Sequence, residues 1–292
     1  MNTSAFTFGA IGTIWQISLS GVDAVKAEAV LLAIKDRVEA FEAAYSRFRP
    51  DSIVGQIAKS ASDYRLPDDA APMIELYRKF YKVTDGTVTP LIGQVLSDAG
   101  YDTAYSLKPK PSIAPAKDWD TVMSFEAPIL HVNEPIKLDF GAIGKGYIVD
   151  IVAELLSAKG IAEYTVNAGG DIAHQSMDGA ALRVGLEDPE DSKLVIGQAE
   201  LGDACLAGSA GNRRTWDRFH HIIDPRTVES PRHIKALWVV ADSTALADGL
   251  ATALFFTTPE KLAKQFDFSY VILNADRSAV ISPNFPGELF SK

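Results

Sequence analysis

Residues 138–160 read LDFGAIGKGYIVDIVAELLSAKG, and this stretch indicates the fold class more clearly than any other. A short strand is expected at its start, then a glycine-rich turn (GAIGKG), then a helix that ends at Gly160. Glycines let a backbone approach a ligand, the N–H groups of a helix N-terminus attract anions, and Lys145 adds positive charge. A tight strand-to-helix turn without a ligand would show the same glycines.

The segments around this stretch mix strands and helices without regular alternation. The helix expected over residues 22–45 has Asp23 as its cap. Its expected apolar face contains Val25, Ala29, Leu32, Val38, Phe41 and Tyr45. Residues 107–119 hold three prolines and read as an irregular connector. The absence of repeated βαβ units favours an α+β fold over a doubly wound sheet. Strands are expected over 10–19, 163–174, 182–189, 195–201, 233–241 and 270–276, and further helices over 72–84 and 243–257.

Composition excludes several classes of protein. The chain has 292 residues, 47% hydrophobic and 23% charged, which is typical of a globular protein and not of a disordered or low-complexity one. A net charge of −10 argues against nucleic acid as a partner, because the protein's field repels phosphates. No apolar run is long enough for a membrane span, and the first basic residue is Lys26, so a secretory signal is not expected. With Cys205 as its single cysteine, the protein is expected in the cytoplasm.

Asp248 and Thr252 suggest a metal site. They lie four residues apart in the helix expected over 243–257, so both face the same side. A carboxylate and a hydroxyl, joined by a backbone carbonyl, form a set of hard oxygen ligands that suits Mg²⁺. The alternative is a polar pair on an apolar helix, with Thr252 bonded to its own turn. Burying an aspartate in such a helix is costly unless it has a partner.

The stretch FHHIIDPRT (residues 219–227) contains a candidate general base. In an extended segment His221 and Ile223 share one face, and His220 points to the other. A histidine of ordinary pKa can take a proton near neutral pH, whereas a surface histidine pair before a turn is the alternative. The NAGGD stretch (residues 167–171) is either a turn that approaches a ligand or a hairpin connection with a capping aspartate.

Taken together and in order, these segments resemble the ApbE family of flavin transferases. The resemblance extends from about Ile11 to about Phe256, and its most specific parts are LDFGAIGKGYIVD, HIIDPRT and ADGLAT. It also includes IGTIW, SRFRPDSIVGQIA, DGTVTPL, VNAGGDI and the GSAGNRR region (residues 208–214). The family usually has Met where Ile11 stands and Asp where Thr89 stands, so the flavin contacts are not identical.

The resemblance implies a fold and a set of site residues. It implies a single domain over residues 1–292, with ApbE-like (T-fold-like) mixed sheets and packed helices, and two lobes with the site between them. It implies that Mg²⁺ is held by Asp248, Thr252 and the carbonyl of Ala142, and that His221 is the base for the acceptor hydroxyl. The expected FAD contacts are Ile11, Phe48, Thr87, Val88, Thr89, Asp139, Lys145 and Ile223.

The implied activity is Mg²⁺-dependent transfer of FMN from FAD to a threonine or serine hydroxyl of an acceptor protein, with release of AMP. Attack on a diphosphate needs charge stabilisation, which a bound metal supplies, and a local cation can attract an anion even to an acidic protein. Two alternatives remain open: a Mg²⁺-dependent FAD pyrophosphatase that gives FMN and AMP, and a protein that binds FAD without turnover.

Overall fold

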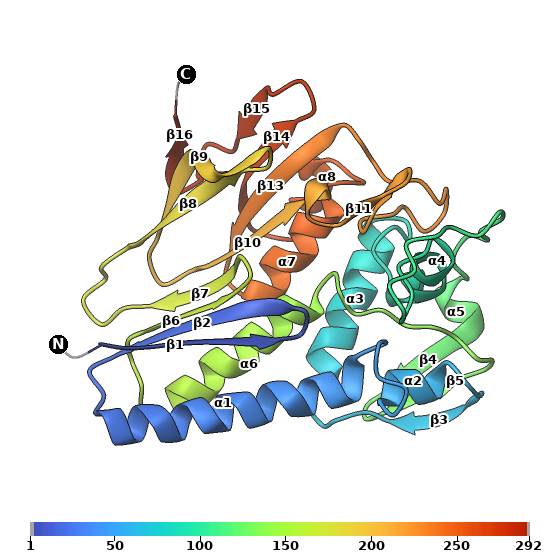
Figure 1. The fold of residues 1–292 in the computed structure, drawn as a ribbon, viewed down its shortest axis with the longest axis horizontal. Coiled ribbons are helices and arrows are strands. Elements are labelled where there is room, and N and C mark those ends of the chain that lie inside the picture. The colour runs from blue at the N-terminus through green and yellow to red at the C-terminus, as the bar shows by residue number, and fades with distance from the viewer. Residues whose placement is uncertain (1–2, 291–292) are drawn as a thin grey trace.

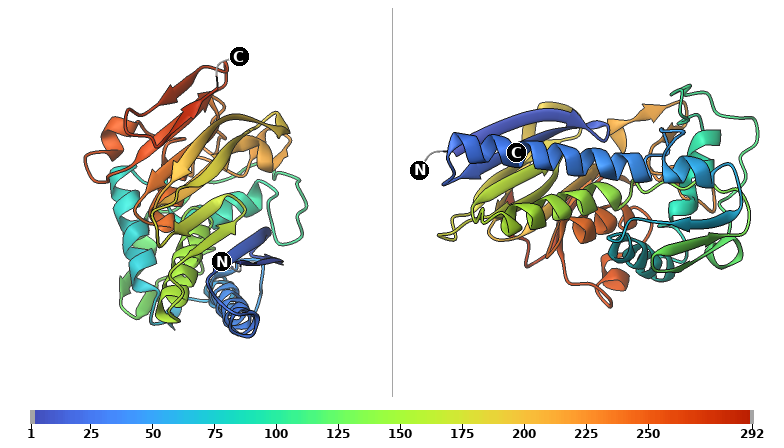
Figure 2. Two further views of the ribbon diagram at one scale, coloured as in Figure 1. Left: turned by 90° about the vertical axis from the view of Figure 1, so that its left-hand side faces the viewer. Right: turned by 90° about the horizontal axis from the view of Figure 1, so that it is seen from below.

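The computed structural model describes residues 3–290, which form three layers (Figure 1). A large antiparallel sheet lies in the middle, helices cover one face, and a small sheet packs on part of the other. Figure 2 shows α1 and α6 lying along the same side of the large sheet. The mixture of antiparallel sheets and packed helices confirms the α+β class.

The large sheet has eight strands, and each described pair is antiparallel. Their order is β1 (Thr3–Ala10), β2 (Thr13–Ser20), β6 (Tyr164–Ala168), β7 (Asp171–Gln175), β10 (Cys205–Ala210), β13 (Ile234–Ala241), β14 (Ser269–Asn274) and β15 (Ala279–Ile281). There are three smaller sheets among the described residues. In one, β9 (Asp191–Leu201) lies between β8 (Leu182–Asp188) and β16 (Gly287–Leu289), and in another, β5 (Ile129–Val132) lies between β3 (Ser62–Arg65) and β4 (Met123–Glu126). The third pairs β11 (Thr215–Trp216) with β12 (Phe219–His220).

The long helices are amphipathic or buried, and the short ones shape the loops. The long ones are α1 (Ala24–Tyr45), α3 (Ala71–Val83), α6 (Gly144–Ala158) and α7 (Thr244–Ala253). The short ones are α2 (Ile53–Ile57), η1 (Pro90–Ile92), α4 (Gly93–Asp98), α5 (Trp119–Val122), η2 (Gly211–Arg213) and α8 (Pro259–Leu262). Within the part of the chain that the structure describes, none of these helices has the length and apolar character needed to cross a membrane.

Two apolar clusters hold the layers together. The larger one lies between the sheet and its helices and contains Trp15, Val166 and Leu250. The smaller one lies between the opposite face of the sheet and the β8–β9 layer and contains Leu206 and Trp238. Because β13 contributes to both clusters, it is buried on both faces, and its sequence (IKALWVVA) is apolar apart from Lys235.

Helix α1 confirms the expected cap and the second half of the expected face, where Val38, Phe41 and Tyr45 are buried, and corrects the face in its first turns. Asp23 accepts a hydrogen bond from the N–H of Lys26 at 2.8 Å, as the sequence predicts. Val25 and Leu32, expected inside, are 82% and 62% exposed. The buried stripe of the first turns instead runs through Ala27, Val30 and Ile34. The pattern was ambiguous because alanine and valine occur on both sides of this helix.

Two strand predictions also need correction. The single strand expected over residues 10–19 is part of a hairpin: β1 ends at Ala10, β2 begins at Thr13, and Ile11 and Gly12 form the turn with φ of 51° and 67°. The short strand expected just before the GAIGKG turn is an extended segment without a ladder, where Asp139 donates its N–H to the carbonyl of Pro90. Gly160 does follow α6 with a φ of 69°, as expected for a C-terminal glycine.

Candidate active site

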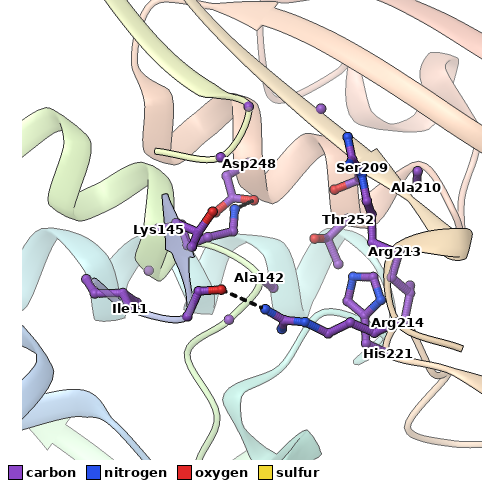
Figure 3. A pocket seen from close by; sticks show the side chains of 18 of the residues that line it. Ile11, Ala142, Lys145, Ser209, Ala210, Arg213, Arg214, His221, Asp248 and Thr252 are labelled. Atoms are coloured by element: carbon purple, nitrogen blue, oxygen red, sulfur yellow. Dashed lines mark hydrogen bonds and ion pairs between the residues drawn. The ribbon is translucent and has the colours of Figure 1, made fainter. Parts of the chain in front are cut away.

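All twelve candidate site residues line one pocket of about 1010 Å³. It opens at the end of the β6–β7 hairpin, where β2 and β10 continue past the turn formed by Gly169 and Gly170. The candidates come from segments far apart in sequence, and the fold brings them together (Figure 3). They are Ile11, Phe48, Thr87, Val88, Thr89, Asp139, Ala142, Lys145, His221, Ile223, Asp248 and Thr252.

Helices α6 and α7 form the bottom of the pocket and pack unusually closely. A Cβ added at Gly146 would lie 2.2 Å from the carbonyl oxygen of Thr244, so only glycine permits this approach. Asp150 of α6 accepts hydrogen bonds from the N–H groups of Thr244 and Ala245, at 2.7 and 2.8 Å, and so caps α7. These contacts fix α7, and with it Asp248 and Thr252, against the GAIGKG turn.

We call Lys145, Asp248 and Thr252, which line the pocket, together with the fully buried Asp171, the floor of the pocket. Lys145 is ion-paired with Asp171, and its Nζ lies 3.5 Å from Oδ1 of Asp248. The other oxygen of Asp248 accepts the N–H of Gly146 at 3.1 Å. The N-terminus of α6, expected to face an anionic ligand, therefore already binds an internal carboxylate. Asp171, considered as a hairpin cap from sequence, is instead the ion-pair partner of Lys145.

The floor holds more negative than positive charge. Asp171 and Asp248 are buried and share one lysine. Burial, followed by the charge of Asp171, raises the pKa of Asp248 to about 7. Burial alone lowers the pKa of Lys145, but the two carboxylates outweigh it and the net shift is upward. Oδ1 of Asp171 has no hydrogen-bond partner among residues 3–290. A second cation would relieve this imbalance.

The residues present fit a hard divalent cation. A buried carboxylate (Asp248), a hydroxyl one helical turn later (Thr252) and a carbonyl in the adjoining turn (Ala142) line the same pocket. Oxygen donors of this kind suit Mg²⁺ better than softer metals. Within residues 3–290 there is no group of three or more His, Cys, Asp or Glu side chains arranged for a metal, so such a cation depends on this mixed set.

His221 reaches the pocket and His220 does not. Nε2 of His220 lies 2.8 Å from the carbonyl oxygen of Pro231, and this ring is buried away from the pocket. Nδ1 of His221 has no partner among residues 3–290. Burial, followed by the charge of Arg214, lowers the pKa of His221 from 6.5 to about 3. The imidazole is therefore neutral at physiological pH, and the expectation of an ordinary near-neutral pKa is wrong for this structure.

We call Phe48, Tyr101, Tyr105 and Arg214 the rim of the pocket. The rings of Phe48 and Tyr105 are stacked, with centroids 5.2 Å apart. Arg214 donates to the hydroxyl of Tyr101 at 2.5 Å and to the carbonyl of Gly12 at 3.3 Å, the bond drawn in Figure 3. Sequence reasoning included Phe48 but not the other three. The GSAGNRR stretch, which contains Arg214, entered only through the family resemblance and without a role for this arginine, and no pattern singled out Tyr101 or Tyr105.

An arginine supports the candidate flavin contact Asp139. Nε of Arg47 donates to Oδ2 of Asp139, and Oδ1 of Asp139 accepts the N–H of Gly141 at 2.7 Å. The Arg47 guanidinium also lies over the ring of Phe48, 4.2 Å from its centroid. Asp139 is therefore held in place at the start of the GAIGKG turn, and Arg47 was not among the residues singled out from sequence.

The DGTVTP loop lines the pocket with few free polar groups. The hydroxyl of Thr87 donates to the carbonyl of Thr84 at 3.0 Å, and the hydroxyl of Thr89 accepts the N–H of Leu91 at 3.2 Å. Val88 is buried between them. The threonine hydroxyls thus stabilise the loop, and the loop offers a ligand mainly shape and apolar contact.

Comparison with known proteins identifies the family. The sequence profile of the ApbE family matches residues 11–271 of this chain. The chain belongs to the ApbE family. Curated relatives of this ApbE chain include the FAD:protein FMN transferase of Escherichia coli K12, 23% identical over 275 residues (86% of this chain and 77% of the relative). The corresponding protein of Klebsiella pneumoniae is 27% identical over 274 residues, with the same shares covered.

Solved ApbE structures share the fold. The flavin transferase ApbE of Vibrio cholerae superimposes with a TM-score of 0.80 at 22% identity and covers 97% of this chain and 98% of its own. The ApbE protein of Thermotoga maritima gives a TM-score of 0.85 at 22% identity, with 98% and 100% covered. The α+β architecture of mixed sheets and packed helices is therefore that of ApbE proteins.

Proposed function

We propose that this ApbE chain transfers FMN from FAD to a threonine or serine hydroxyl of an acceptor protein and releases AMP. Its relatives carry the name of this activity. The observation that carries the proposal is that Lys145, Asp248 and Thr252 of the floor line one pocket with His221 and the predicted flavin contacts. The chain is thereby proposed to be a flavin-binding transferase with FAD as its substrate.

The reaction makes one bond and breaks one. The acceptor oxygen attacks the phosphorus on the FMN side of FAD, a new P–O bond forms, and the P–O bond to the adenylate breaks, so that AMP leaves. The acceptor hydroxyl loses one proton. Charge collects on the phosphoryl oxygens and on the leaving AMP, so positioning and charge stabilisation account for most of the catalysis.

Asp248, Thr252 and the carbonyl of Ala142 would hold Mg²⁺ in this proposal. When bound there, Mg²⁺ supplies positive charge to the diphosphate oxygens. Lys145 keeps the floor ordered by pairing with Asp171 and Asp248. Asp150 keeps α7, and hence both side-chain ligands, at a fixed distance from the GAIGKG turn.

His221 is proposed to accept the proton of the acceptor hydroxyl. Its low pKa means that the imidazole is neutral and its unpartnered Nδ1 is free to accept a hydrogen bond. Negative charge from a bound diphosphate would favour the protonated form and so raise the basicity of this ring. The remaining candidates, which include Ile11, Thr87–Thr89 and Ile223, are proposed to contact FAD through shape and apolar surface.

The experiment is direct. The protein is incubated with FAD, Mg²⁺ and a candidate acceptor peptide that contains threonine or serine. The expected result is flavin fluorescence on the peptide that survives denaturation, together with an equal amount of AMP. AMP without labelled peptide would instead show a pyrophosphatase, and bound FAD with neither product would show a binding protein.

Three finer features remain proposals. We place the chain in the cytoplasm, and its single cysteine, Cys205, supports this. Burial raises the pKa of the Cys205 thiol to about 11. We treat residues 1–292 as one domain, supported by a family match and structural matches that cover most of the chain. We expect two lobes around the pocket, which receives residues from α6 and α7 on one side and from the segments around Phe48 and Tyr101 on the other.

A further inference from the structure

Four side chains with permanent positive charge line the pocket, and one of them lacks an acidic partner. Arg47 pairs with Asp139, Lys145 with Asp171 and Asp248, and Arg213 with Glu187. Arg214 has no carboxylate within 4.0 Å among residues 3–290. In a protein with a net charge of −10, this is a notable exception inside a pocket.

Arg214 is also held in a defined position. It donates from Nη1 to the hydroxyl of Tyr101 and from Nη2 to the carbonyl of Gly12, which lie in segments far apart in the chain. Its guanidinium lies near the ring of Tyr101, 5.6 Å from the centroid. These contacts use two of the five N–H groups of the guanidinium, and the rest remain available to a ligand.

The backbone links Arg214 to the candidate base. The N–H of His221 donates to the carbonyl of Arg214 at 3.1 Å. Figure 3 shows the Arg214 side chain extending past His221 toward Ile11, on the side of the pocket where Ala142 lies. The guanidinium therefore lines the same pocket as Lys145, Asp248 and Thr252 of the floor.

We propose that Arg214 is a phosphate-binding residue, whose charge is neutralised by a phosphate of the nucleotide substrate. Arginine suits this role because its planar fork bonds two phosphate oxygens at once. Nothing in the family motifs quoted above assigns the residue a role. The inference rests on the proposed function in that the phosphate is taken to belong to the FMN half or the AMP half of FAD.

The alternative is that Arg214 only ties the β1–β2 turn to Tyr101. The two roles predict different behaviour. A structural tie would weaken the binding of every ligand equally, with or without phosphate. A phosphate contact would weaken only the phosphorylated ones, and its contribution would fall with added salt because the site is open to solvent.

The test measures binding in the presence of EDTA, so that a metal cannot mask the arginine. AMP and adenosine form one pair of probes, and FMN and riboflavin form the other. For the unaltered protein we expect at least one phosphorylated probe to bind about tenfold more tightly than its unphosphorylated partner, the size typical of a hydrogen-bonded charge. Arg214→Gln should abolish this preference and leave adenosine and riboflavin binding unchanged.

Two further variants keep the test decisive. Arg214→Lys retains the charge but loses the fork, and it should keep part of the preference. Arg213→Gln removes the same charge from the neighbouring residue, which Glu187 already neutralises, and should keep the preference within about twofold. Loss of the AMP preference would assign Arg214 to the leaving nucleotide, and loss of the FMN preference would assign it to the transferred phosphate.

Several results would overturn the inference. The first is that the unaltered protein shows no preference for AMP over adenosine or for FMN over riboflavin, and the second is that Arg214→Gln keeps both preferences. The third is that Arg213→Gln loses the preference as fully as Arg214→Gln does. The fourth is that Arg214→Gln weakens the binding of adenosine and riboflavin as much as that of AMP and FMN. If none of the four probes binds to the unaltered protein, the proposed function itself fails. That outcome is distinct from binding that is insensitive to Arg214.

Discussion

The floor and the rim of the pocket are built in different ways. The floor lies on the two helices α6 and α7 and on β7. Its ionic groups are paired with one another, with both carboxylates buried and the Lys145 side chain 32% exposed. The rim comes from loops and chain turns, and its aromatic rings and arginine reach into the open side of the pocket, with Tyr105 51% exposed. Chemistry that needs fixed atoms is placed on rigid elements, whereas recognition is left to segments that can adjust.

This difference predicts that floor variants change turnover and stability, and that rim variants change affinity. The largest effect is expected at Asp248. Asp248→Ala removes the only carboxylate in the proposed metal set, so Mg²⁺-dependent AMP release should fall by roughly 10³-fold or more. Mg²⁺ titration and AMP release measure this.

Asp242→Ala serves as the matched control, since it removes an exposed aspartate six residues earlier in the chain. It should leave turnover unchanged. Thr252→Val, which keeps the shape of the side chain, should have an intermediate effect. Full activity in Asp248→Ala would reject the metal assignment.

His221 should affect transfer more than binding. His221→Gln should reduce flavin transfer by about 10²-fold or more while FAD affinity changes by less than about threefold. Fluorescence quenching measures the binding, and labelled acceptor measures the transfer. A parallel loss of FAD binding would show that His221 is a ligand contact instead of a base.

His221 also predicts a pH dependence of stability. Burial lowers its pKa to about 3 in the folded protein, against 6.5 when exposed. Between these values the unfolded chain binds more protons, so His221 makes the folded protein less stable as the pH falls from about 6.5 toward 3. Denaturant unfolding at several pH values should show a shallower decline in His221→Gln, and identical curves would contradict the buried, neutral state.

Lys145 should be the most sensitive position for stability. Lys145→Met leaves Asp171 and Asp248 buried without their shared cation, so the free energy of unfolding should fall by about 3 kcal/mol. Added Mg²⁺ should recover part of this loss, because it replaces positive charge in the floor. Urea unfolding with and without Mg²⁺ measures both effects.

The exposed ion pair of Lys261 and Asp85 provides the control. Lys261→Met should show no measurable change in stability and no dependence on Mg²⁺. A Lys145→Met protein as stable as the unaltered one would show that the two floor carboxylates are not held against each other by this lysine.

The smallest effect is expected at the rim. Tyr105→Ala removes the ring stacked on Phe48, and FAD should bind about two- to tenfold more weakly, the range expected for loss of one aromatic contact. Thermal unfolding should not change, because the ring is half-exposed. A large loss of stability, or of turnover at saturating FAD, would remove the distinction between floor and rim.

The sequence predicted the floor better than the rim, because most of the floor residues lie in short sequence motifs. The GAIGKG turn and the Asp248–Thr252 spacing, which belong to the floor, each lie within a few residues and reach the pocket as expected. The same holds for His221 and Ile223 of the HHIID stretch, outside the floor. Asp171 was recognised only as a turn residue, because its partner Lys145 lies 26 residues away in the sequence. Tyr101, Tyr105 and Arg214 depend on the packing of distant loops, which no local spacing shows.

The helices and strands also divide into those that local sequence patterns predict and those that depend on neighbouring elements. Helices α3, α6 and α7 and the strands β8 and β13 correspond closely to their patterns. Strand β10 (CLAGSA) was not predicted, because it has little of the branched and aromatic character typical of strands and is held by its neighbours β7 and β13. Val25 and Leu32 of α1 show the opposite case, in which an apolar local pattern does not lead to burial. Both side chains stay at the surface because no neighbouring layer covers them.

The central claim is that a divalent cation joins the floor to the diphosphate of FAD. A crystal grown with FAD and Mn²⁺, measured for the anomalous signal of the metal, tests it most directly. The account predicts one peak within coordination distance, about 2.0–2.4 Å, of oxygens of Asp248, Thr252, Ala142 and the diphosphate. A peak elsewhere in the pocket, or FAD bound with its diphosphate away from Asp248, would contradict it.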